Sequence, residues 1–339
     1  MAEPRIVCFG EILLRLSAPG AELLLQTPQL KVCVGGAEAN VAVSLARLGH
    51  AAAMVSVLPA NALGRAALEE VRKHGVDVSG VLTGEGRMGL YFLAPGALRR
   101  ASEVLYDRAD SAFARAEPEA VDWDAALEGA DWFHLSGVTA AVGPNAARAA
   151  VRAARAARAR GLTVSFDCNY RAKLWESWEG DGPAILREIM AEADLVFGDH
   201  RDAALLLGGD YTTRGAEQRR RLAADAAFAA FPNLKLMSST VRIQHSVDHN
   251  DLSGLLFSRH ESWRTPIWPL TPIVDRIGGG DAFAAGLIHG LRRKLPEQEA
   301  LEFGLAAACL KHAIPGDFNL ASETDVRALM SDAALDVKR

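Results

Sequence analysis

Short apolar runs alternate with longer amphipathic stretches along most of the chain. Residues 5–9 have the continuous apolar character of a buried strand, and residues 37–48 have helical spacing of apolar positions that ends at Gly49. Further strand-like runs occupy 51–57, 132–135, 163–167, 194–197 and 235–239, and helical stretches occupy 62–74, 144–160, 199–207 and 215–230. This order predicts an α/β fold, with a doubly wound, mostly parallel sheet and helices on both faces.

Two stretches interrupt the alternation, at about residues 12–34 and 86–108. In the second, residues 90–93 and 104–106 have strand character with no helix between them. Together the two stretches predict a small antiparallel β lid, which is expected to close over the ligand crevice at the carboxyl ends of the main strands. Because no repeat or Pro-rich linker divides the chain, residues 1–339 are expected to form a single domain with this lid.

Composition and charge narrow the range of partners. Half of the residues are hydrophobic and 23% are charged, as in globular proteins, and the net charge of −5 gives no general attraction to nucleic acid or to a membrane surface. The arginine-rich run at 146–160 is interpreted as the solvated face of a helix. No run of about 18 apolar residues, no secretory signal and no C-x-x-C pair occurs. These features predict small-molecule partners and a cytoplasmic location.

Candidate chemistry concentrates in two Gly-rich segments. Gly278, Gly279 and Gly280 precede a long apolar-periodic helix, and Asp281 follows them. Successive glycines and a helix amino terminus form an anion hole, beside which a carboxylate can act as general base. The alternative is that the glycines make a turn and Asp281 only caps the helix. The second segment, residues 35–40, leads into the first long helix and ends at Asn40.

Gly35, Gly36 and Asn40 near the start, with residues 278–281 near the end, resemble the two signatures of the ribokinase-like, or PfkB, carbohydrate kinases. The resemblance covers nearly the whole chain, and the runs 9–16, 35–49, 89–91, 167–171 and 173–175 are similar to those of 2-keto-3-deoxygluconate kinases. It implies a ribokinase-like fold with a β lid. It also implies transfer of a phosphoryl group from ATP, accompanied by Mg²⁺, to the terminal hydroxyl of 2-keto-3-deoxygluconate, giving the 6-phosphate.

The resemblance also implies a role for each matching residue. Asp281 would be the base, and the backbone of Gly278, Gly279 and Gly280 would stabilise charge on the transferred group. Substrate contacts would come from Gly36, Asn40, Tyr91, Tyr106, Arg108, Asn169, Arg171 and Asp275. The nucleotide would be bound by Asp199, Thr240, Arg242, Gly278 and Gly280, and Asp202 would act on the metal indirectly.

The two arginines suit a sugar acid, because guanidinium groups bind carboxylates through paired hydrogen bonds. The alternatives are an exposed lid charge for Arg108 and a structural salt bridge for Arg171. The resemblance further suggests a homodimer or higher homo-oligomer that associates through the lid.

Three departures from the family pattern leave other functions open. The usual Asn-x-x-Glu motif is replaced by residues 199–202, the usual glycine-containing nucleotide loop is replaced by residues 240–250, and Asp107 stands next to Arg108. An acid there would oppose a carboxylate substrate unless it points away. The alternatives are another PfkB sugar kinase, such as a fructokinase, or a catalytically silent protein that binds a sugar acid or a nucleotide.

One cluster of residue types stands outside these motifs. His245, His249 and His260 fall within sixteen residues, with Asp248 and Asp251 among them. They follow no fixed metal-ligand spacing, so the segment is interpreted as a polar surface loop.

Overall fold

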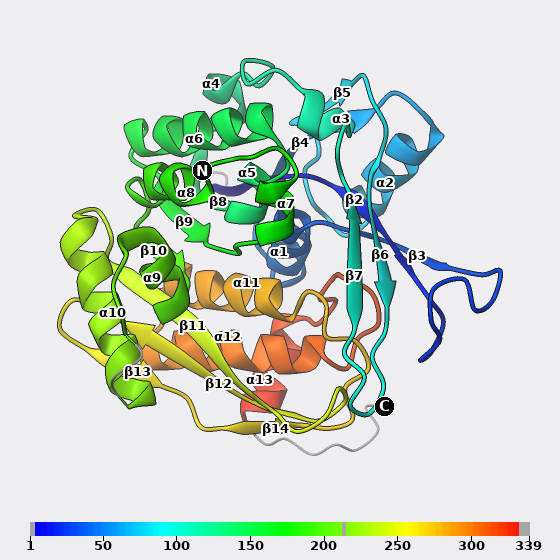
Figure 1. Ribbon diagram of the computed structural model, residues 1–339. Coiled ribbons are helices and arrows are strands. Elements are labelled where there is room, and N and C mark those ends of the chain that lie inside the picture. The colour runs from blue at the N-terminus through cyan, green and yellow to red at the C-terminus, as the bar shows by residue number, and fades with distance from the viewer. Residues whose placement is uncertain (1–3, 212–214, 332–339) are drawn as a thin grey trace.

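The computed structural model describes residues 4–211 and 215–331, which contain two β-sheets (Figure 1). The larger sheet has ten strands in the order β13-β12-β11-β10-β9-β8-β1-β4-β5, with β14 paired to β12. Its strands are β1 Arg5–Phe9, β4 Ala52–Pro59, β5 Val81–Gly84, β8 Ala130–Ser136, β9 Thr163–Asp167, β10 Leu195–Phe197, β11 Leu236–Gln244, β12 Asn250–Phe257, β13 Ser262–Arg264 and β14 Trp268–Leu270. Pairing is parallel from β5 to β11 and antiparallel beyond β11, which confirms the predicted mostly parallel sheet.

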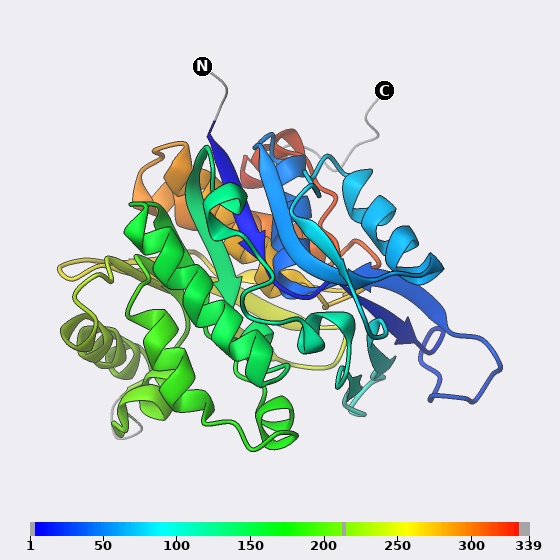
Figure 2. The same ribbon diagram turned by 90° about the horizontal axis from the view of Figure 1, so that it is seen from above.

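Helices cover both faces of this sheet, and an apolar core fills each side. In Figure 2 a green layer containing α6 and α8 lies on one side, and a blue and orange layer containing α1, α11 and α12 lies on the other. The first layer comprises α3 Ala112–Arg115, α4 Trp123–Ala126, α5 Gly137–Ala140, α6 Pro144–Ala159, α7 Ala172–Glu176, α8 Gly182–Met190, α9 His200–Leu207 and α10 Ala216–Ala230. The second comprises α1 Ala37–Arg47, α2 Ala62–Arg72, α11 Gly279–Arg292, α12 Glu297–Lys311 and α13 Glu323–Met330. In the part of the chain that the structure describes, none of these helices has both the length and the apolar character to cross a membrane.

The arginine-rich helix α6 shows why its composition does not imply a nucleic-acid partner. Its alanines are buried against the core, whereas Arg152, Arg155 and Arg160 pair at the surface with Glu119, Glu188 and Asp124. Side chains at helical spacing therefore divide between a packed alanine face and a solvated arginine face.

The smaller sheet has four strands in the order β3-β2-β6-β7, at the right of Figure 1. They are β2 Leu13–Ser17, β3 Lys31–Gly35, β6 Gly89–Ala94 and β7 Glu103–Asp107, so they fall within the two stretches expected to form the lid, apart from one residue of β3. The outer pairs are antiparallel as expected, but β2 and β6 are parallel. The parallel pairing follows from connectivity, because β2 continues from β1, and β6 is reached only after α1, β4, α2 and β5.

In the second half of the chain one expectation was wrong and one helix was missed. Residues 240–250 do not form a loop after a strand that ends at 239: β11 continues to Gln244 and forms an antiparallel hairpin with β12. Alternation of Val241 and Ile243 with Arg242 and Gln244 suits such a strand. The long helix α12 was not predicted, because it is buried around much of its circumference and has no clear apolar stripe.

A buried ion-pair cluster joins the smaller sheet to the loops at the far end of the chain. Arg15 on β2, only 2% exposed, donates two hydrogen bonds to Asp275, at 2.6 and 3.1 Å, and its Nε lies 3.1 Å from Asp317 Oδ1. Tyr91 on β6 donates to Asp317 Oδ2 at 2.8 Å. Asp275 also accepts the Gly316 amide at 3.0 Å. The lid strands are therefore bonded to the segments on either side of α11 and α12.

Removing the arginine charge should destabilise the protein severely. In Arg15→Met the carboxylates of Asp275 and Asp317 would keep their burial and lose their counter-charge, so we expect a loss of about 3–5 kcal/mol in the free energy of unfolding. The surface pair Arg152–Glu119 provides the control, and Arg152→Met should cost less than about 1 kcal/mol. Urea unfolding of both variants measures the difference. Equal, small losses would mean that the cluster contributes no more than a surface pair.

Candidate active site

The Gly-rich segment at residues 278–280 forms the amino terminus of α11. Gly278 has a left-handed backbone with φ of +79°, and a Cβ there would lie 2.1 Å from the carbonyl oxygen of Asp317. A Cβ on Gly279 would lie 2.7 Å from His312 Cε1. Gly280 is different, because nothing lies within 4 Å of its Cβ position. The first two glycines are needed for packing, and the third faces open space at a helix amino terminus, where an anion is stabilised.

Asp281 lies in the first turn of α11 and bonds across to α1. Its Oδ2 accepts a hydrogen bond of 2.7 Å from Asn40 Nδ2. The helix N-cap is Gly278, and no side chain caps it. The interpretation of Asp281 as a capping residue was therefore wrong. The two Gly-rich segments lie together in the structure, since each supplies one partner of this bond.

The surroundings of Asp281 raise its pKa to about 7. Burial is the main cause, and the negative charges of Glu38 and Asp317 add to it, whereas the Asn40 bond and Arg171 act in the opposite direction. A general base is most effective when its pKa is near the working pH. Asp281 therefore combines the position and the proton affinity of a base beside an anion-binding helix terminus.

The Gly-rich segment at residues 35–40 is held by close backbone packing. Gly36 has φ of +135°, and a Cβ there would lie 2.2 Å from the carbonyl oxygen of Glu11. Two residues later, the buried Glu38 Oε1 accepts bonds from the Ser136 amide and hydroxyl at 2.8 and 2.7 Å, and from Thr139 Oγ1 at 2.7 Å. Glu38 thereby fixes α1 against the carboxyl end of β8, which positions Asn40.

The carboxyl end of β9 brings a further acid and an arginine to the same place. Burial and the charge of Asp281 raise the pKa of Asp167 to about 8, while Arg171 lowers it. Asn169 has φ of +36°, and its amide donates to Asp167 Oδ1 at 3.2 Å. Arg171 is exposed, and its side chain bonds only the Tyr170 carbonyl oxygen among the described residues. The structural salt bridge considered for Arg171 is absent from residues 4–211 and 215–331.

The lid contributes aromatic and charged residues, and its charged residues Asp107 and Arg108 already have partners within the protein. Arg108 is 6% exposed and donates from Nε to Glu11 Oε2 at 2.6 Å, so an exposed lid charge was the wrong alternative. Asp107 pairs with Arg87, which accounts for an acid at this position. Tyr106 lies opposite Tyr91 across β6 and β7.

The expected nucleotide and metal residues lie on α9 and β11. Asp199 and Asp202 form a capping box at the start of α9, in which the Asp199 amide donates to Asp202 Oδ2 at 2.7 Å. Burial raises the pKa of Asp202 to about 6; the bonds and charge of Arg201 outweigh burial at Asp199 and lower its pKa. Thr240 and Arg242 are on β11, and burial and the charges of Arg276 and Arg201 lower the pKa of Arg242.

The predicted residues thus do not all lie in one cluster. Asn40 and Asp281 are in direct contact, and Arg171 is close enough that its charge lowers the pKa of Asp281. Asp275 and Tyr91 instead belong to the buried cluster around Arg15. Sequence reasoning missed the roles of Glu11, Arg15, Glu38, Asp167 and Asp317. A usable signal existed for Asp167, which ends a predicted strand within a run that resembles the family.

The fold and this site define a ribokinase-like phosphotransferase, and comparison with known proteins places the chain in one family. Residues 3–318 match the pfkB family carbohydrate kinases, and the chain belongs to that family. It is 34% identical to the 2-dehydro-3-deoxygalactonokinase of Haloferax volcanii, covering 98% of each chain. It is 38% identical to the crystal structure of the 2-dehydro-3-deoxygluconokinase of Thermotoga maritima, covering 97% of this chain and 98% of that one, with a TM-score of 0.91. The 2-dehydro-3-deoxygluconokinase of Bacillus subtilis is 27% identical, covering 92% of this chain and 91% of that one.

The site predicts a particular pH dependence of phosphoryl transfer. If Asp281 is the base, it must be deprotonated to act, so kcat/KM should rise as the pH increases through about 7. In Asp317→Asn one like charge that raises the pKa of Asp281 is lost, so the midpoint should move to lower pH by up to about one unit. The surface change Asp124→Asn should leave the profile unaltered. A midpoint that stays or rises in Asp317→Asn would contradict the effect of the Asp317 charge on Asp281.

Proposed function

We propose that this carbohydrate kinase phosphorylates the terminal hydroxyl of 2-keto-3-deoxygluconate, giving the 6-phosphate with ATP as donor. The observation that carries the proposal is the pairing of Asp281 with Asn40 beside the open helix terminus at Gly280. The names of the relatives support a 2-keto-3-deoxy sugar acid as substrate. Since one relative is named for the galactonate form, 2-keto-3-deoxygalactonate is the second candidate.

In the proposed reaction the substrate hydroxyl loses its proton to Asp281 as its oxygen forms a bond to the γ-phosphorus. The bond from that phosphorus to the ADP oxygen breaks, and ADP leaves. Amides of Gly278, Gly279 and Gly280, with the positive end of the α11 dipole, stabilise charge on the phosphoryl oxygens. Gly36, Tyr91, Tyr106, Asn169 and Asp275 are carried forward as predicted substrate residues, and Thr240, Arg242 and Asp199 as predicted nucleotide residues.

The residues near the site fit Mg²⁺ bound together with ATP. Mg²⁺ takes oxygen ligands and usually binds through one or two carboxylates, substrate phosphates and retained waters. Asp202 and Asp167 are carboxylates whose pKa values are raised mainly by burial, so a nearby cation would offset the cost of their ionised forms. Bound Mg²⁺ would neutralise phosphate charge, and Asp202 is the residue we propose to hold it, through water.

Recognition of the substrate carboxylate rests on the arginines. The charge of Arg108 is already matched by Glu11, whose Oε1 also accepts a hydrogen bond from Ser111. Arg171 has no carboxylate partner among the described residues and is exposed at the carboxyl end of β9. We therefore assign the main carboxylate contact to Arg171, with Arg108 placed to assist. A neutral sugar such as fructose would leave this charge unused, which favours the sugar acid over a fructokinase function.

A substrate panel tests the proposal. ATP turnover with Mg²⁺ should be selective for 2-keto-3-deoxygluconate or its galactonate form over fructose and ribose. Asp281→Asn should lower kcat by roughly 10²–10⁴-fold, because it removes the base but keeps the shape. Arg171→Gln should raise KM for the sugar acid about tenfold or more, whereas the exposed neighbour in Lys173→Gln should have little effect.

The possible outcomes separate the alternatives. Equal turnover of neutral sugars, unaffected in Arg171→Gln, would establish a different PfkB sugar kinase. Tight binding of a sugar acid without ATP turnover would establish a silent binding protein. Undiminished activity in Asp281→Asn would reject the assigned base.

We also propose that the protein forms a homodimer through the outer face of the lid. Strand register places Leu16 beside Val32 and Phe92, and Phe92 beside Leu105, on one face. Val32 and Leu105 are 56% and 55% exposed, and contiguous apolar surface of this kind is typical of an interface. The four free cysteines agree with the cytoplasmic location that we propose.

A charge placed on that face should separate the subunits. Leu105→Glu should shift the mass measured by light scattering towards the monomer, because burying an unpaired carboxylate opposes association. Leu63→Glu, on α2 and 54% exposed, is the matched control and should leave the mass unchanged. A wild-type monomer, or a dimer that persists in Leu105→Glu, would contradict the proposed interface.

A further inference from the structure

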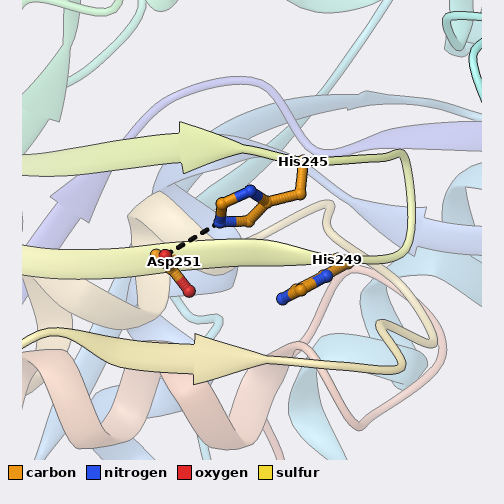
Figure 3. Close-up of side chains that lie close together, drawn as sticks. All are labelled: His245, His249 and Asp251. Carbon is orange, nitrogen blue, oxygen red and sulfur yellow. Dashed lines mark hydrogen bonds and ion pairs between the residues drawn. The ribbon is translucent and has the colours of Figure 1, made fainter.

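The β11–β12 hairpin brings together three side chains that the kinase site does not use. His245 directly follows β11, His249 directly precedes β12, and Asp251 is the second residue of β12 (Figure 3). In the continued register His245 stands opposite His249, and the His245 amide donates to the His249 carbonyl oxygen at 3.0 Å. His249 and Asp251 are two residues apart on one strand, so their side chains share a face. The three residues follow no fixed metal-ligand spacing in the sequence, and the pairing of the hairpin is what brings their side chains together.

The geometry of the three side chains is that of an open ligand set. One ligand atom from each lies within 4.8 Å of the others, and His245 Nε2 is already 2.8 Å from Asp251 Oδ2. The two imidazole rings are 4.5 Å apart between centroids. A tetrahedral zinc ion holds its ligand atoms roughly 3.4 Å apart, as follows from bonds of about 2.0–2.1 Å. Binding would therefore require side-chain rotation that brings the ligand atoms closer together. Among the described residues, no other trio of His, Cys, Asp or Glu meets this criterion.

We propose that His245, His249 and Asp251 form a binding site for a divalent transition-metal ion, with Zn²⁺ as the best chemical match. Two imidazole nitrogens and one carboxylate oxygen suit Zn²⁺, Co²⁺ or Ni²⁺, whereas Mg²⁺ requires oxygen ligands and would bind poorly. Three protein ligands leave at least one position for water. The site is therefore chemically distinct from the Mg²⁺ that accompanies a nucleotide.

The location of the hairpin turn gives this site a structural consequence. The Val247 amide donates to the carbonyl oxygen of Leu98, in the loop that joins β6 to β7, at 3.2 Å. The Asp248 carbonyl oxygen accepts the Ile273 amide at 2.9 Å, just before the segment that leads to Gly278. An ion that cross-links His245 to His249 closes the base of this turn. It would therefore stabilise a contact between the tip of the lid and the segment leading to the anion hole.

Zinc retention tests the site directly. Protein without a histidine tag and without nucleotide would be incubated with Zn²⁺, dialysed, and analysed for metal by mass spectrometry. The wild type should retain one ion per chain. His249→Ala should bind Zn²⁺ at least about tenfold more weakly, because loss of even an outer partner costs about 10–100-fold. His260→Ala removes an exposed histidine of the same region and should retain the ion.

Hydrogen exchange gives a second readout. Zn²⁺ should slow exchange of the Val247 and Ile273 amides in the wild type and in His260→Ala, but not in His249→Ala. The substituted side chains, His249 and His260, are partly or fully exposed, so the metal-free variants should fold normally. Unchanged melting temperatures of these variants would exclude misfolding. Absence of retained zinc in the wild type, or retention that is the same in His249→Ala, would overturn the proposal.

Discussion

The buried charge of Arg15 is the constraint on which the positions of both the lid and the anion hole depend. An arginine that is 2% exposed requires carboxylates, and it obtains them from Asp275 and Asp317, which flank the α11–α12 pair in the sequence. Asp317 in turn occupies the space that a Cβ on Gly35 or Gly278 would need. The glycines of both motifs therefore leave room for Asp317, which neutralises the charge of Arg15 on the lid. Because a buried ion pair contributes little to stability by itself, its main effect here is to select one arrangement of segments.

The same region combines a helix terminus that favours anions with several buried carboxyl groups. The amino terminus of α11 favours anions, yet Asp281, Glu38, Asp167 and Asp317 place four carboxyl groups around it. Three of the four have pKa values raised to between about 6 and 8, and that of Glu38 is raised as well. Such a group of acids is costly while no cation is bound, and it holds protons near neutral pH. Binding of a nucleotide with its cation would lower that cost, which couples the proton affinity of the base to occupancy of the site.

How much the sequence predicted depended on how local the determining interactions were. The strand at 163–167 and the helix at 62–74 carry their own patterns, and each glycine motif carries its own turn chemistry, so these were predicted well. The bond between Arg15 and Asp275 spans 260 positions and leaves no local pattern. Helix α12 was missed because burial around its circumference removes the polar face by which a helix is recognised. Asp167 ends a predicted strand but was not assigned a role, because its interaction with Asp281 joins segments that only the folded chain brings together.

The hairpin of β11 and β12 shows that a departure from a family pattern has consequences of its own. In the sequence, residues 240–250 replace the glycine-containing nucleotide loop that is usual in the family. In the structure the same residues extend the sheet, and their turn contacts both the lid loop at Leu98 and the segment at Ile273. Extended pairing places every second side chain on one face, so histidines four residues apart become opposite neighbours across the turn. The segment that was interpreted as an altered nucleotide loop therefore also connects the two sheets, and the side chains at its base are the ones that we propose to bind a metal ion.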